Sequence, residues 1–165
     1  MTNQDLLLPK LYFSYGQFMV FDQSVKLPGC DWTDAHFAQG FARRASTACV
    51  RTLGEFGHAD VRVSAARYVP KDEYVRVIAV PFVVESSVVV VEGPEEIGTE
   101  RTIKLPSGNY RLVAAQAMAG EEEEAIDLFF ERVPQPVQSS EILVRDGELD
   151  PSSPLIETAE VAGES

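Results

Sequence analysis

The amino-acid sequence predicts a mainly β protein, α+β at most, built as an antiparallel β-sandwich-like domain with one short helix. Apolar and polar residues alternate with a period of two along much of the chain, as they do in half-buried strands. Turn-forming residues recur about every 8–12 residues, a spacing typical of sandwiches and barrels. Helical spacing of apolar residues occurs near residues 34–45, and the 165 residues suit about one domain.

Clusters of Gly, Pro, Ser and Asn separate the expected strands. In chain order, we expect strands at residues 10–15, 17–22, 47–53, 60–68, 73–84, 88–92, 100–105, 110–117, 125–133 and 141–145. Gly16 separates the first two, which can also be one strand with a bulge. In the strand at 125–133, Asp127 and Glu131 alternate with Ile126 and Leu128, so the acids are expected on one face and the apolar residues on the other.

The predicted helix has both a capping residue and an apolar face. Asp31 or Thr33 can cap its N-terminus, because a short polar side chain accepts a hydrogen bond from the first turn. Phe37 and Phe41 lie four residues apart, which places both on one side of a helix. Gly40 weakens the helix by about 1 kcal/mol relative to alanine, so we expect it to be short.

Charge is distributed unevenly along the chain, whose net charge is −12. Residues 1–94 hold nine Lys and Arg against ten Asp and Glu, whereas residues 95–165 hold five against sixteen. Such a chain should repel nucleic acid and lipid headgroups and attract a basic partner. A need for solubility alone can also explain the acidic charge. Composition further predicts a single β-rich domain over residues 1–146 and an acidic tail over residues 147–165 that is either disordered or lies on the surface.

No common catalytic or metal-binding motif occurs, so we expect neither an enzyme nor a cofactor or metal. His36 and His58 fall in a first helical turn and in a Gly-flanked turn, where solvent-exposed side chains are the simplest expectation. Cys30 and Cys49 are expected to be half-buried free thiols. The first residues lack the basic and apolar segments of a signal peptide, which favours a cytoplasmic protein.

An acidic run followed by a polar strand face is the best candidate for a functional surface. The candidate partner-binding residues are Glu121, Glu122, Glu123, Glu124, Asp127 and Glu131. Carboxylates gathered in this way could imitate the charge of a nucleic-acid backbone. A solvated loop beside a polar strand face explains them equally well. Glu148 and Asp150 are weaker candidates.

Several blocks of sequence resemble the competence protein J family, the DNA-entry nuclease inhibitors. They occur in matching order between residues 10 and 117 and read Ser14-Tyr15-Gly16-Gln17-Phe18-Met19-Val20-Phe21, Asp31-Trp32-Thr33-Asp34, Gly40-Phe41-Ala42, Val80-Pro81-Phe82 and Leu105-Pro106-Ser107-Gly108-Asn109-Tyr110-Arg111-Leu112. The first block is the most specific. For Trp32 and Phe18 we expect core packing rather than partner contact.

The resemblance implies a small cytoplasmic protein that binds a nuclease and blocks it, with kinship to immunity proteins against nuclease toxins. The expected partner is then a basic nuclease, and neither nucleic acid nor a membrane. A second hypothesis is a β-sandwich module that binds a protein or small ligand unrelated to nucleases. A third, a hydrolase, would need a pocket where His36 or His58 meets acids. The sequence leaves the oligomeric state open.

Overall fold

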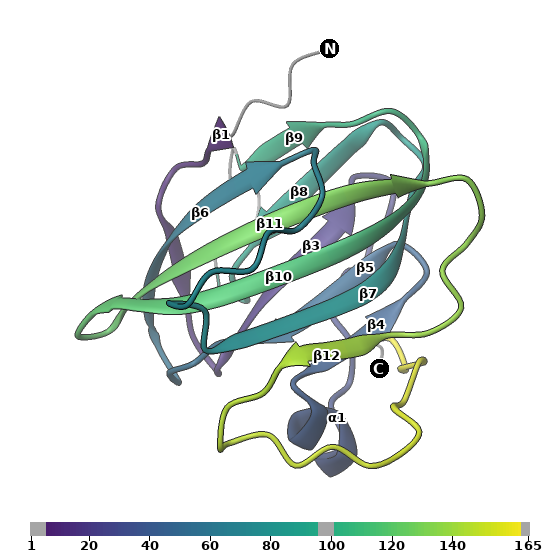
Figure 1. The fold of residues 1–165 in the computed structure, drawn as a ribbon. Helices are drawn as coiled ribbons and strands as arrows, with labels where there is room; N and C mark the ends of the chain where they lie inside the picture. Colours follow the sequence, from purple (N-terminus) through teal and green to yellow (C-terminus); the bar gives the residue numbers. More distant parts are fainter. Residues whose placement is uncertain (1–5, 96–100, 163–165) are drawn as a thin grey trace.

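Two β-sheets pack face to face in the computed structural model, which describes residues 6–95 and 101–162 (Figure 1). The strands are β1 (Leu6–Leu7), β2 (Leu11–Phe13), β3 (Gln17–Asp22), β4 (Phe41–Arg44), β5 (Thr47–Arg51), β6 (Gly57–Ser64), β7 (Arg76–Val84), β8 (Val88–Glu92), β9 (Thr102–Lys104), β10 (Gly108–Gly120), β11 (Glu123–Val133) and β12 (Glu141–Val144). The helix is α1 (Asp34–Gln39). No helix within the described ranges combines the length and apolar character needed to cross a membrane. The predicted mainly β fold with a short helix is confirmed.

The larger sheet has the strand order β1-β6-β11-β10-β7-β12, and β2 also pairs with β6. The smaller sheet has the order β4-β5-β3-β8-β9. Among the described strand pairs, only β6 and β11 run parallel, a feature that the antiparallel prediction did not include. Each of the ten expected strands corresponds to an observed one, whereas β1 and β4 were not expected. Residue 100, at the start of one expected strand, and residues 163–165 of the expected tail lie outside the described residues.

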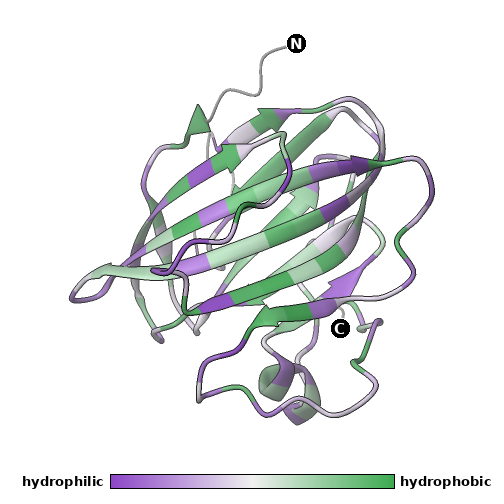
Figure 2. Ribbon diagram, in the orientation of Figure 1, coloured by the Kyte–Doolittle hydropathy of each residue, from purple (hydrophilic) through white to green (hydrophobic). Residues whose placement is uncertain are grey.

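The core lies between the two sheets and includes residues from both. Figure 2 shows hydrophobic and hydrophilic residues alternating along several of the strands. Phe18 and Val20 of β3 contribute from the smaller sheet, and Phe82 of β7 with Leu128 and Phe130 of β11 from the larger one. Phe130 makes an edge contact with Phe82 at 5.9 Å between ring centroids. Burial of these side chains follows the period of two that defines a strand. The expectation that Phe18 packs in the core is confirmed, since it is fully buried.

The helix α1 begins at the predicted cap but ends at Gln39, earlier than residue 45. Thr33 accepts a hydrogen bond from the backbone N–H of His36, and Gly40 ends the helix at φ 90°. In that left-handed conformation the Gly40 N–H donates to the His36 carbonyl, which completes the last turn. Phe41 then enters the core as the first residue of β4. The side chain of His36 is buried rather than exposed, because it completes the cap.

The segment after β12 wraps around α1 instead of leaving the domain. Leu149 is buried at 2% exposure, and the Asp150 N–H donates to the Ala38 carbonyl. Gln39 exchanges two hydrogen bonds with the backbone of Ile156, at 3.0 and 2.8 Å. Hydrogen bonds to backbone groups, together with the buried Leu149 and the partly buried Leu155, therefore hold a stretch whose composition gave little reason to expect contact. The predicted division of the chain at residue 146 remains a prediction.

Candidate partner-binding surface

The acidic run forms the tip of the long hairpin made by β10 and β11. Glu121 and Glu122 lie in the turn, and Glu123 begins β11. Glu122 adopts φ 56°, a left-handed conformation that lets the chain reverse tightly. Glu121 and Glu122 are exposed, and the half-exposed Glu123 side chain lies 3.9 Å from the Lys10 ammonium. We call Glu121, Glu122 and Glu123 the hairpin tip.

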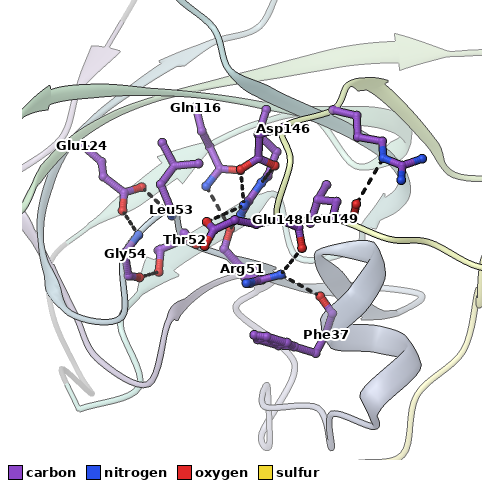
Figure 3. A network of polar contacts seen from close by, with 12 residues as sticks. Phe37, Arg51, Thr52, Leu53, Gly54, Gln116, Glu124, Asp146, Glu148 and Leu149 are labelled. Atoms are coloured by element: carbon purple, nitrogen blue, oxygen red, sulfur yellow. Dashed lines mark hydrogen bonds and ion pairs between the residues drawn. The ribbon is translucent and has the colours of Figure 1, made fainter.

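Glu124 points away from solvent and joins the hairpin to the loop between β5 and β6. Its carboxylate accepts hydrogen bonds from the backbone N–H groups of Leu53 at 3.1 Å and Gly54 at 2.9 Å (Figure 3). Burial raises the pKa of Glu124, and the two backbone donors only partly offset this effect. The Glu124 carboxylate therefore binds the loop at residues 52–56 to the start of β11.

Asp127 and Glu131 share one face of β11, as predicted, but that face is partly covered. The Tyr74 hydroxyl donates to Asp127, and burial together with this bond raises the pKa of Tyr74. Glu131 accepts from the Tyr68 N–H at 2.8 Å and from Arg111 at 3.0 Å. Both acids thus fasten the segment at residues 65–75 to the outer face of the larger sheet.

The structure separates the six sequence-predicted acids into two groups of three. In the hairpin tip, Glu121 and Glu122 are exposed and Glu123 is half-exposed beside Lys10. Glu124, Asp127 and Glu131 accept hydrogen bonds from other parts of the chain. The two tail acids also differ from each other: the half-exposed Glu148 side chain lies 3.6 Å from Arg76, and Asp150 is almost fully exposed near Arg145.

A groove of about 610 Å³ lies against the loop at residues 52–56, whose Leu53 and Gly54 bind Glu124 of the hairpin. Three aromatic side chains, Tyr15, Trp32 and Phe37, line it. Trp32 is half-buried, and its indole N–H donates to Gln17 at 3.1 Å, so the expectation of core packing describes it only in part. We call this the aromatic groove. Sequence reasoning missed it as a site, although Tyr15 beside Gly16 and Trp32 beside the helix cap stand out in the sequence.

Arg51 lies across the aromatic groove in a fixed position. Its guanidinium carbon is 3.6 Å from the centroid of the Phe37 ring, a cation–π contact. The same group donates to the carbonyl oxygens of Phe37 at 3.2 Å and Glu148 at 3.3 Å (Figure 3). Burial and the nearby Arg76 lower the pKa of Arg51. Arg51 therefore joins α1, β5 and the segment after β12 at one place.

Within the described residues, His36 and His58 make hydrogen bonds with backbone carbonyls and the Thr33 hydroxyl, and His58 also contacts an aromatic ring. His36 Nδ1 is 2.9 Å from the Thr33 hydroxyl and Nε2 is 2.9 Å from the Thr158 carbonyl. His58 contacts the Glu122 carbonyl at 3.3 Å and the ring of Tyr12. Among the described residues, no three His, Cys, Asp or Glu side chains gather as a metal ion would require. Cys30 and Cys49 are free and buried.

Comparisons with known proteins identify a family and two solved structures of similar fold. The family model described as Competence protein J (ComJ) matches residues 10–145. The solved structure of ComJ from Bacillus subtilis, described as an inhibitor of the DNA-degrading activity of NucA, is similar with a TM-score of 0.71 at 20% identity, covering 81% of this chain and 100% of that one. A structure described as crocagin biosynthetic gene J is similar with a TM-score of 0.53 at 16% identity, covering 78% and 99%. No curated protein matches the chain.

Proposed function

The chain belongs to the competence protein J family, and from this membership we propose that it binds a nuclease and inhibits it. The observation that carries the proposal is the family match over residues 10–145, joined to a fold shared with an inhibitor of a DNA-degrading activity. In this role the chain performs no reaction of its own. Family resemblance also supports a cytoplasmic location and an immunity role, in which the cell is shielded from a nuclease.

The hairpin tip supplies the contact that we propose with the nuclease. A nuclease must attract the phosphates of DNA, so its substrate cleft carries positive charge. Three carboxylates at the end of a protruding hairpin can enter such a cleft and occupy the positions of phosphates (Figure 1). Complementary charge also speeds the encounter of the two proteins. The net charge of −12 suits a basic partner.

Glu124, Asp127 and Glu131 take a supporting part in this proposal. Their hydrogen bonds to the loop at residues 52–56 and to the segment at residues 65–75 hold β11 in a defined position. A hairpin held in advance loses little conformational freedom on binding, which favours affinity. The hairpin tip thus makes contact, and the other three acids keep it in place.

A DNA-degradation assay tests the proposal directly. The purified chain is titrated against NucA of Bacillus subtilis and against the nucleases purified from cells that make this chain. We expect the chain to inhibit at least one nuclease, and inhibition to be complete at a molar ratio near one inhibitor per nuclease. An unrelated protein of equal net charge is the control, because nonspecific charge binding would affect both alike. If no nuclease is inhibited beyond this control, the proposal is wrong.

A further inference from the structure

We propose that the aromatic groove is a second part of the nuclease interface, and that it accepts a Lys- or Arg-bearing loop of the nuclease. This inference rests on the proposed function and extends it from the hairpin tip to a separate surface. The two surfaces are neighbours, because Thr52, Leu53 and Gly54 line the groove while Leu53 and Gly54 bind Glu124 of the hairpin.

The conformation of Tyr15 is the first observation behind this inference. Tyr15 lies in the tight turn between β2 and β3 at φ 57°, followed by Gly16 at φ 66°. A left-handed backbone is unfavourable for an aromatic residue, and Gly or Asn would occupy the position more easily. The Tyr15 side chain is 73% exposed, so core packing does not compensate the strain. Backbone strain of this kind concentrates at functional sites.

The composition of the groove is the second observation. Tyr15, Trp32, Phe37 and Arg51 line one hollow, and Trp, Tyr and Arg are the residues most enriched at the energetic centres of protein interfaces. Phe37, on the short helix α1, is 46% exposed, a large fraction for an apolar ring. A cluster of exposed rings around a recess offers large, rigid contact area to a partner.

The rim of the groove determines what kind of partner segment fits. Glu55 and Glu148 both line it with accessible side chains, and Glu148 also lies 3.6 Å from Arg76. Asp31 and Asp34 flank the groove residues at the start of α1 and are exposed. Arg51 is the groove's own cation and is already paired with the Phe37 ring. A long basic side chain can therefore pack its apolar stem on the rings and place its charged end among the carboxylates.

The floor beneath these residues is rigid. Arg76 is fully buried, and its Nη1 donates to the carbonyl oxygens of Arg51 and Thr52, each at 3.1 Å. Gln116 donates to the Arg51 carbonyl as well, at 2.9 Å (Figure 3). The end of β5 is thus fixed from below before any partner arrives. A surface held in its binding conformation loses less entropy on association.

The test uses the nuclease that the wild-type chain inhibits, with Tyr15→Asn as the main variant. Asparagine accepts the left-handed backbone but removes the ring, so the variant should unfold at a higher temperature and yet bind the nuclease at least about tenfold more weakly. The paired variant Glu55→Gln with Glu148→Gln should weaken binding at low salt and reduce its salt dependence. Val69→Ala, which removes apolar surface at an exposed position outside the groove, should leave binding unchanged.

The possible results separate this inference from the proposed function. Inhibition by the wild type and loss of affinity in both groove variants, but not in Val69→Ala, supports the groove. Wild-type inhibition with unchanged affinity in the groove variants overturns the groove and leaves the proposed function standing. A melting temperature of Tyr15→Asn at or below that of the wild type also overturns the inference, because its premise of strain is then wrong. Failure of the wild type to inhibit any nuclease removes both proposals.

Discussion

Arg76 and Asp146 form a bidentate ion pair that ties three separate parts of the chain together. Nε and Nη2 of Arg76 donate to the two carboxylate oxygens of Asp146 at 2.9 and 2.8 Å. Arg76 belongs to β7 of the larger sheet, and Asp146 follows β12 at the start of the segment that wraps α1. The remaining donor group of Arg76 binds the end of β5 in the smaller sheet. A buried cation therefore replaces apolar packing where the two sheets and the C-terminal segment meet.

Removing the Asp146 carboxylate from this pair should lower the stability of the fold. Asp146→Asn leaves the buried charge of Arg76 with only the half-exposed Glu148 carboxylate, 3.6 Å away, and loss of one member of a buried pair costs about 3–5 kcal/mol. We expect the free energy of unfolding, measured with urea, to fall by about 3 kcal/mol, near the low end, because the Asp146 side chain is 19% exposed. The control is Asp60→Asn, in an exposed pair with Lys10, which should change it by less than about 1 kcal/mol. Equal effects of the two variants would contradict this account.

Gly40 should be essential for ending α1 where it ends. An alanine there would be held at φ 90°, and its Cβ would lie 2.9 Å from Ile78 Cδ1 and 3.1 Å from a Leu149 methyl group. Gly40→Ala should therefore lower the free energy of unfolding by about 2 kcal/mol. Gly147→Ala is a matched control, because nothing lies within 4 Å of its added methyl group. Thermal unfolding of the two variants should separate them clearly, and similar midpoints would show that the backbone at Gly40 relaxes.

The sequence allowed most strands to be predicted, and the failures have local physical causes. Phe37 and Phe41 are spaced for one helix, yet Phe37 is 46% exposed on α1 while Phe41 is fully buried on β4. Between them, Gly40 adopts a left-handed conformation that ends the helix directly before β4. The spacing of apolar residues alone does not reveal this change from helix to strand. The contacts of the segment after residue 146 have no signal in the sequence, because they are made mainly by backbone groups, which every sequence carries.

The candidate surface was predictable only where it depends on strand alternation. Extending the alternation of Ile126 and Leu128 back by two residues turns Glu124 inward, so its burial had a visible signal. The hydrogen bond from Tyr74 that covers Asp127 had no signal in the sequence, since the two residues are far apart along the chain. The aromatic groove likewise unites β2–β3, α1 and the β5–β6 loop, and no local pattern shows that they meet.

Asp22 should make stability depend on pH in the acid range. Burial alone would raise the pKa of Asp22, but donors from Ser24, Ser86 and Glu85 together outweigh burial and lower it below 3.8. The Ser24 hydroxyl lies 2.6 Å from the carboxylate, and the Glu85 N–H 2.8 Å. A lowered pKa means that the ionised group stabilises the fold above pH 3.8, and that this contribution disappears as pH falls through the folded-state value.

Asp22→Asn tests this dependence. At pH 7 the variant should be less stable by about 1–3 kcal/mol, because a neutral amide cannot accept from all these donors. Urea unfolding curves from pH 7 to pH 2 should show the gap to the wild type narrowing below pH 3.8. A gap that stays constant over this range would mean that folding does not shift the pKa of Asp22.

Charge reversal at the hairpin tip should slow association with the nuclease. Glu121→Lys combined with Glu122→Lys replaces two exposed carboxylates, so attraction to a basic cleft is lost at the tip itself. We expect the association rate at low salt to fall about tenfold or more and its dependence on salt to flatten. Asp72→Lys combined with Glu73→Lys changes the net charge equally at two other exposed positions and is the control. If both pairs slow association alike, overall charge rather than the hairpin tip guides the nuclease. If only the tip variant is slow, the hairpin is the part of the chain that the nuclease meets first, because steering depends on where the charge lies within roughly one Debye length of the partner.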